Sequence, residues 1–462
     1  MRNTIGGIAL GIAASVVVAA GLDGRWAYSQ GEPTVAALAV RAAALEREVA
    51  LLEDLNAIKK LQRSYGFYTD KQLWSDAADL FSSDGTIEVG GRGVYEGPER
   101  IREFLRLHGP ETPQPNRLFD QMQLQPIVHV AADGLTAQGR WHVFAQEAVH
   151  GEYAHWGLGV LENDYVKEGG IWKIRRHHFY TTMYTPYEAG WGKTAIPNDA
   201  PSADLPPDRP STVAYEAFPK AFVVPFHYDN PVTRPTPNVR EGAVVAAAAA
   251  NADSLEATLA AVSRRVGLLE DVAQLERLNS IYGYYLAHLQ WDDLTGIFSP
   301  NGSIEIAMRG VYVGAASVRR NLNLYGQATD DQFGLQHNHM QFQPVVTVAP
   351  DGQSAKVRSR ALSIMGNWQR NSQWMGGVYE NDYVKEGGIW KIKRDQVFNT
   401  YFIPYAVGWK DVVPRPPPGI TAANPPDAPP TLPFEMYPSA FLPPFHYPHP
   451  VTGRPVTGTP PQ

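Results

Sequence analysis

The sequence contains no cysteine, which removes several classes of chemistry before any motif is considered. Disulfide bonds, a catalytic thiol and thiolate ligands for a metal all require cysteine and are therefore excluded. A lipid anchor of the bacterial lipoprotein type is excluded for the same reason. The 462 residues suffice for two or three domains, and each must be held together by its own apolar core.

Long runs of basic charge are also absent. Lys and Arg number 40 against 47 Asp and Glu, and the formal net charge of −7 is spread along the chain. Nucleic acid requires clustered positive charge, so it is not an expected partner. The chain also lacks a phosphate-binding glycine loop, a Gly-x-Ser-x-Gly elbow and a dinucleotide fingerprint. We therefore expect chemistry without a cofactor.

Metal-ligand patterns are sparse. His337 and His339 are spaced to lie on one face of a strand, but no carboxylate or third histidine adjoins them. Two ligands are too few for a structural or catalytic zinc site. No metal site is expected.

The N-terminus has the pattern of an export signal over residues 1–29. Arg2 precedes an apolar run from Ile5 to Leu22, and small residues allow cleavage after Ala20 or Ser29. The alternative is an uncleaved membrane anchor, because the run is long enough to span a bilayer when tilted. We expect the mature protein to be periplasmic or secreted.

One long motif occurs twice and predicts two homologous domains. The first copy, residues 159–176, reads GVLENDYVKEGGIWKIRR, and the second, residues 377–394, reads GVYENDYVKEGGIWKIKR. Their separation is far too long for a solenoid repeat, which points to a duplicated domain. The Gly-Gly pair suits a tight turn between two strands, so each copy predicts a hairpin that closes the sheet of its domain.

The same order of elements surrounds each hairpin. A long helix runs into Tyr65 in the first half and Tyr282 in the second, and each is followed by a short helix that begins at a tryptophan. A strand, a third helix and three further strands complete each unit. The two leading helices carry apolar residues at 4-3 spacing, so they could pair within the chain, pair with a second chain to form a homo-oligomer, or lie on their own domains.

Proline-rich stretches divide the remainder. We expect a first domain at 35–194, an arm at 195–235, a linker at 236–254, a second domain at 255–411 and a C-terminal arm at 412–462. Proline interrupts both helix and sheet, so the arms should be extended segments over the surface.

The ordered motifs resemble a known family. In the first half they are Tyr65, Asp70, Trp74, Phe81, Gly159, Asp164, Gly170, Trp172 and Ile174, and most recur in the second half. This pattern resembles the SnoaL-like branch of the nuclear-transport-factor-2-like superfamily, in its dehydratase, dehydrochlorinase and lyase group. The resemblance implies an α+β fold of two tandem cone-shaped barrels, each with three helices packed on a bent, mostly antiparallel sheet and each preceded by a long helix. It also implies an intrachain pseudo-dimer.

The resemblance further implies an Asp–His dyad in which histidine is the general base, but neither half keeps both residues. Asp70 matches the family aspartate, whereas Gln121 stands at the histidine position; in the second half His339 is present and Ala287 replaces the aspartate. The first half offers other histidines on its strands, and Tyr65 could donate to an oxyanion. The candidate catalytic residues are therefore Asp70, His129, His142, His178 and Tyr65.

Period-2 alternation supplies candidate substrate-binding residues. Gln121, Gln123 and Gln125 share one face of a strand, which would line a pocket inside a cone or face water outside it. Adjacent His177 and His178 must point to opposite faces. The remaining candidates are aromatic or lie in the second half: Tyr68, Trp74, Tyr180, Tyr285, His339 and Gln341.

Two functions are compatible with these observations. The first is a cofactor-independent lyase or isomerase that removes a proton from a small hydrophobic molecule, aromatic or polycyclic, in the first cone. The second is a non-catalytic periplasmic binding or scaffold protein with degenerate cone pockets, which the divided dyad favours.

Overall fold

The computed structural model describes residues 34–233, 252–326, 333–413 and 422–458. The predicted signal at 1–29 and most of the predicted linker lie outside these residues. No helix in the described ranges has both the length and the apolarity needed to cross a membrane.

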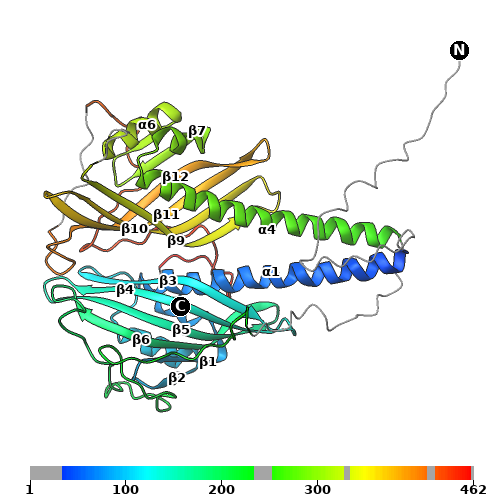
Figure 1. Cartoon of the computed structure of the whole chain (residues 1–462), viewed down its shortest axis with the longest axis horizontal. Coiled ribbons are helices and arrows are strands. Elements are labelled where there is room, and N and C mark those ends of the chain that lie inside the picture. The colour runs from blue at the N-terminus through cyan, green and yellow to red at the C-terminus, as the bar shows by residue number, and fades with distance from the viewer. Residues whose placement is uncertain (1–33, 234–251, 327–332, 414–421, 459–462) are drawn as a thin grey trace.

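The two halves of the chain repeat one α+β unit (Figure 1). The first consists of α1 (Val35–Thr69), α2 (Trp74–Ala78), β1 (Phe81–Val89), β2 (Val94–Glu96), α3 (Gly97–Arg106), β3 (Arg117–Val130), β4 (Thr136–Val149), β5 (Tyr153–Glu168) and β6 (Ile171–Pro186). The second consists of α4 (Ala252–Ala287), α5 (Trp291–Gly296), β7 (Phe298–Ile306), β8 (Val311–Val313), α6 (Ala315–Leu322), the 3₁₀ helix η2 (Asn323–Tyr325), β9 (Leu335–Val348), β10 (Ser354–Asn367), β11 (Asn371–Glu386) and β12 (Ile389–Pro404). The predicted fold class is confirmed.

Each unit contains one six-stranded mixed sheet. The strand order is β2-β1-β6-β5-β4-β3 in the first and β8-β7-β12-β11-β10-β9 in the second, and only the β1–β6 and β7–β12 pairs are parallel. The doubled motif forms the β5–β6 and β11–β12 hairpins, turning at glycines with positive φ such as Gly169 and Gly170. These hairpins lie at the centre of each sheet.

The doubled motif also anchors the leading helix. Asp54 of α1 is buried and accepts hydrogen bonds from Lys167 Nζ at 2.6 Å and Trp172 Nε1 at 2.9 Å. Asp271 of α4 is held in the same way by Lys385 and Trp390. A buried carboxylate needs both a counter-charge and hydrogen bonds, which accounts for the lysine and the tryptophan on either side of the turn.

The long helices pair with each other within the chain (Figure 1). Ion pairs join Arg265 to Glu53 and Arg63 to Glu276, each at 2.6 Å. Ala42 and Val49 of α1 and Leu255 and Val262 of α4 are buried. Other apolar positions of the same 4-3 pattern remain exposed, namely Leu45, Leu52, Leu259 and Val266. Pairing with a second chain therefore stays a prediction.

The two units pack against each other as a pseudo-dimer. Their shared core includes Met122 and Trp156 from the first sheet and Leu362, Tyr401 and Trp409 from the second unit. The rings of Trp156 and Trp409 lie 4.5 Å apart, and Tyr401 donates a hydrogen bond of 2.5 Å to Gln146. The interface thus combines aromatic packing with a hydrogen bond between the units.

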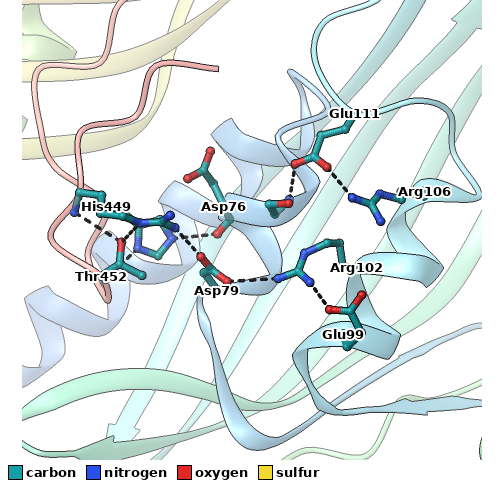
Figure 2. A network of polar contacts seen from close by, with 10 residues as sticks. Asp76, Asp79, Glu99, Arg102, Arg106, Glu111, His449 and Thr452 are labelled. Atoms are coloured by element: carbon teal, nitrogen blue, oxygen red, sulfur yellow. Dashed lines mark hydrogen bonds and ion pairs between the residues drawn. The ribbon is translucent and has the colours of Figure 1, made fainter. Parts of the chain in front are cut away.

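The described parts of the arms are largely irregular, and the C-terminal arm is more than a surface segment. It crosses from the second unit to the first, where Tyr447 and Val456 are buried in the first unit's core. Figure 2 shows His449 beside α2, with Nε2 donating to the Asp76 carbonyl at 2.8 Å while Nδ1 accepts the Thr452 amide. The C-terminal arm therefore links the second unit to the first through both buried side chains and hydrogen bonds.

A buried ion-pair cluster lies between the units. Arg360 of β10 contacts Asp70, which follows α1, and Asp120 of β3. All three side chains are almost wholly buried. Removing the guanidinium would leave two carboxylates in an interface with little water, which is strongly unfavourable.

We expect Arg360→Met to lower the free energy of unfolding by about 3–5 kcal/mol, because both aspartates lose their ion pair with Arg360. Urea unfolding followed by tryptophan fluorescence measures this change. The matched control is Arg176→Met, which removes an exposed pair with Asp164 and should cost at most about 1 kcal/mol. Equal effects of the two substitutions would show that the buried cluster does not hold the units together.

Candidate active site in the first cone

A cavity of about 320 Å³ lies inside the first cone. The sheet, the end of α1, α3 and residues 196–199 of the first arm contribute to its wall. Much of the lining is apolar or aromatic, including Phe104, Phe119 and Phe179. Its polar groups come from α1 and β3 to β6, and also include Arg92, His108 and Asp199.

Glu147 of β4 is a half-buried carboxylate that lines this cavity. It accepts hydrogen bonds from the Tyr184 hydroxyl at 2.9 Å and from Gln121 Nε2 at 3.2 Å. Burial raises the pKa of Glu147, and these two hydrogen bonds oppose the rise. The result is a fixed carboxylate that is more basic than an exposed glutamate.

Tyr65 and His177 lie together on another part of the lining. Their ring centroids are 4.5 Å apart, and His177 Nδ1 lies 3.5 Å from the Asn163 amide nitrogen. Burial, with a smaller effect of His178, lowers the pKa of His177 to about 3, so its imidazole is neutral at physiological pH. Burial also raises the pKa of Tyr65, which keeps its phenol protonated. Both rings can donate a hydrogen bond without carrying charge.

Asp70 does not take part in this site. Its carboxylate accepts the Gln121 backbone N–H at 2.7 Å and pairs with Arg360 of the second unit. The backbone turns at the end of α1 and aims Asp70 at the interface between the units. The predicted pairing of Asp70 with a sheet histidine in the first cone is therefore wrong.

The three predicted sheet histidines also lie outside the cavity. His129 contacts His227 of the first arm at 2.9 Å, and His142 contacts Gln125 at 2.5 Å. His178 points to the opposite face from His177, where its ring stacks on Tyr180 at 3.8 Å. Strand alternation required one of the two adjacent histidines to face the cone, and the structure selects His177 rather than His178.

The predicted glutamine row is divided by a β-bulge. Gln121 lines the cavity, but Gln123 is buried against Gln62 of α1 at 2.9 Å. Gln125 has a positive φ of 49° at the irregularity between Leu124 and Ile127, which turns it toward His142. The alternation that placed all three on one face ends at this bulge.

The remaining aromatic candidates are structural. Trp74 is fully buried and donates to the Gly109 carbonyl, while Tyr68 stacks on His449 of the C-terminal arm. Tyr180 packs against Tyr215 and Phe222 of the first arm. Tyr285 is half-buried against the core of the second unit. None of these four is among the cavity-lining residues.

The second cone has an acid and an imidazole of its own, at other positions. Asp395 stands where the first unit has His177, and it accepts hydrogen bonds from Tyr282 at 2.9 Å and Asn381 at 2.7 Å. His339 contacts Ser363 and Tyr379, and Gln341 contacts Ser359. Burial raises the pKa of Asp395 to about 7 and lowers that of His339 to about 3. Neither cone therefore depends on the other for a carboxylate and an imidazole.

The sequence reasoning missed Glu147 because it searched the family's dyad positions, the sheet histidines and the tyrosines, and no other carboxylate. The sequence did contain a pattern that indicates Glu147. It alternates with Val143 and Ala145 on one face of the strand, and because both are buried, the Glu147 carboxylate is expected to point inward as well. Among the described residues, no group of three or more His, Asp or Glu side chains has the arrangement of a metal site.

The model of the SnoaL-like domain family matches residues 50–178 and again residues 268–395. A solved structure of a scytalone dehydratase homologue from Novosphingobium aromaticivorans shares 22% identity, covering 33% of this chain and 95% of its own, with a TM-score of 0.28. A type 2 hexachlorocyclohexane dehydrochlorinase shares 18% identity, covering 32% of this chain and 97% of its own, with a TM-score of 0.27. Since the family model matches both units and more than half of the sequence, the chain belongs to the SnoaL-like family as a tandem of two such domains.

Proposed function

We propose that this protein is an exported, cofactor-independent lyase or isomerase that acts on a small hydrophobic, aromatic or polycyclic molecule in the first cone. The observation that carries the proposal is the cavity itself, where the Glu147 carboxylate and the neutral Tyr65–His177 pair share one enclosure with a mixed polar and apolar lining. A volume of about 320 Å³ is at the lower end for ligand pockets, which favours a small substrate.

Glu147 is the proposed general base. A base is most effective when its pKa lies near the working pH, and burial moves the pKa of Glu147 in that direction. His177 is a poor base because its pKa is lowered to about 3. Tyr184 and Gln121 hold the Glu147 carboxylate in place.

The proposed elimination begins when Glu147 takes a proton from the carbon next to a carbonyl group. Tyr65 and His177 donate hydrogen bonds to the carbonyl oxygen as it gains negative charge. The electron pair then forms the carbon–carbon double bond, and the departing hydroxyl takes the proton from Glu147 and leaves as water. In an isomerisation, Glu147 would instead return the proton to a different carbon. In both cases the enzyme regains its starting charge.

We expect Glu147→Gln to reduce kcat/KM by about 10²–10⁴-fold, the usual contribution of a general base, while ligand binding persists. The assay screens aromatic and polycyclic β-hydroxy ketones by tryptophan fluorescence and then follows formation of the enone by its absorbance. Glu152→Gln is the matched control because Glu152 is exposed in the β4–β5 turn. Tight binding with no turnover by the parent protein would instead establish a non-catalytic binding protein.

The pH profile tests which group titrates. If Glu147 is the base, kcat/KM should rise with pH through a pKa above the ordinary value of about 4.3 for glutamate, since the ionised form is the active one. The lowered pKa of His177 predicts no further limb near pH 6.5. If the Glu147→Gln variant still turns over and its kcat/KM still falls below about pH 6.5, a histidine is the base.

Export is proposed from Arg2 and the apolar run that follows it. We expect fractionation of a native bacterial host to place the protein in the periplasm or medium, with an N-terminus after Ala20 or Ser29. The double substitution Val17→Asp and Val18→Asp should retain the full-length protein in the cytoplasm. Two charges interrupt the apolar run that an export signal requires. A full-length cytoplasmic parent protein would refute export.

A further inference from the structure

The first arm supplies part of the wall of the cavity in the first cone. Residues 196–199 of this arm are among the lining residues. The Ile196 N–H donates to the Tyr184 carbonyl at 2.8 Å, and the two residues form an isolated β-bridge. The segment is therefore held directly beside Tyr184, whose hydroxyl donates to Glu147.

Within this segment, Asp199 pairs with Arg92, which also lines the cavity. Arg92 lies in the turn between β1 and β2, and its Nε donates to Asp199 Oδ2 at 2.9 Å. Arg92 Nη2 contacts the same oxygen. Nε and Nη2 form one edge of the guanidinium, and such an edge binds a carboxylate through two parallel hydrogen bonds. Asp199 therefore occupies the position that the carboxylate of a ligand would take.

The Arg92–Asp199 pair lies where the cavity meets solvent. The Asp199 side chain is 59% exposed, and that of Arg92 is 22% exposed. The two charges nevertheless act on the interior of the cone. Burial raises the pKa of Glu147, and among the smaller effects Arg92 lowers this pKa while Asp199 raises it. The guanidinium and the carboxylate thus face the same space as Glu147.

The charged side chains of the lining balance each other. Arg92 and Arg117 are the guanidinium groups, and Glu147 and Asp199 are the carboxylates. Burial lowers the pKa of the lining histidines, so they add no positive charge at neutral pH. Arg117 already donates from Nη1 to the His108 carbonyl. A carboxylate that enters this cavity loses water without gaining the Arg92 edge, which is unfavourable, whereas an uncharged ligand does not meet this cost.

We propose that Asp199 makes the first cone selective for uncharged ligands, because it occupies the Arg92 edge and cancels the charge of Arg92. The ligand class is then an aromatic or polycyclic ketone or alcohol without a carboxylate group. Removal of the Asp199 carboxylate frees Arg92 to bind a ligand carboxylate instead. This inference rests on the first cone being the ligand site of the proposed function, but it does not require turnover there.

The test measures binding to the full chain by calorimetry at neutral pH, with 2-acetonaphthone as the uncharged probe and 2-naphthoate as a carboxylate of similar shape. We expect the parent protein to bind 2-acetonaphthone more tightly than 2-naphthoate. Asp199→Ala should bind 2-naphthoate at least about tenfold more tightly than the parent does, as expected for charge-assisted hydrogen bonds to the freed guanidinium. Its affinity for 2-acetonaphthone and its Tm should change little, because an exposed ion pair contributes little to stability.

Asp208→Ala is the matched control. Asp208 lies in the same arm and pairs with Arg100, but neither residue is among the described lining residues of the cavity. This substitution loosens the arm without freeing Arg92, so it should bind both probes like the parent. Asp199→Asn removes the charge with little change of shape and should give a smaller gain for 2-naphthoate. Adding Arg92→Met to Asp199→Ala should remove the gain.

Unchanged 2-naphthoate affinity in Asp199→Ala, with 2-acetonaphthone still bound, would overturn this inference alone. An equal gain in Asp208→Ala would also overturn it, because the gain would then come from a looser arm. The same holds if the parent prefers 2-naphthoate. Binding of neither probe by any of these proteins would overturn both this inference and the first cone as the ligand site.

Discussion

The contact of Arg360 with Asp70 and Asp120 is the constraint on which the arrangement of the two units depends. One guanidinium and two carboxylates, buried together, fix the position of β10 against β3 and the end of α1. Buried charges have few alternative partners. Their ion pairs therefore restrict the relative position of the two units more tightly than the apolar contacts around Trp156 and Trp409 do. The same contact takes Asp70 away from the interior of the first cone.

Loss of Asp70 from the cone explains how the two sites could diverge. In the first unit the carboxylate comes from Glu147 of β4 and the imidazole from His177 of β6. In the second unit β12 carries the carboxylate, Asp395, and β9 carries the imidazole, His339. Each carboxylate receives a hydrogen bond from a tyrosine, Tyr184 or Tyr282. Duplication thus preserved the chemical groups inside each cone while exchanging the strands that supply them.

The C-terminal arm breaks the equivalence of the two units. After Phe445 it continues onto the first unit, where His449 contacts Asp76 beside α2 (Figure 2). Arg454 pairs with Asp79 at the end of the same helix. In the first arm, the Asn230 side chain accepts hydrogen bonds from the backbone N–H groups of Val232 and Thr233, as His449 does for its own turn. Val232 is nevertheless 85% exposed, so this turn is not packed against a unit as the turn at His449 is. The two proline-rich arms therefore share a local conformation but not a docking partner.

The sequence by itself determined the duplicated α+β fold, because the doubled hairpin, the apolar periodicity and the turn glycines are local signals that tertiary packing did not oppose. It also identified Tyr65 and Gln121 as residues of the first cone. Only the tertiary structure decided that His177 rather than His178 faces the cavity, that Glu147 is its carboxylate and that Asp70 belongs to the interface. The place of Asp70 depends on Arg360, which lies more than two hundred residues away in the sequence, and such a long-range contact is not encoded in local spacing.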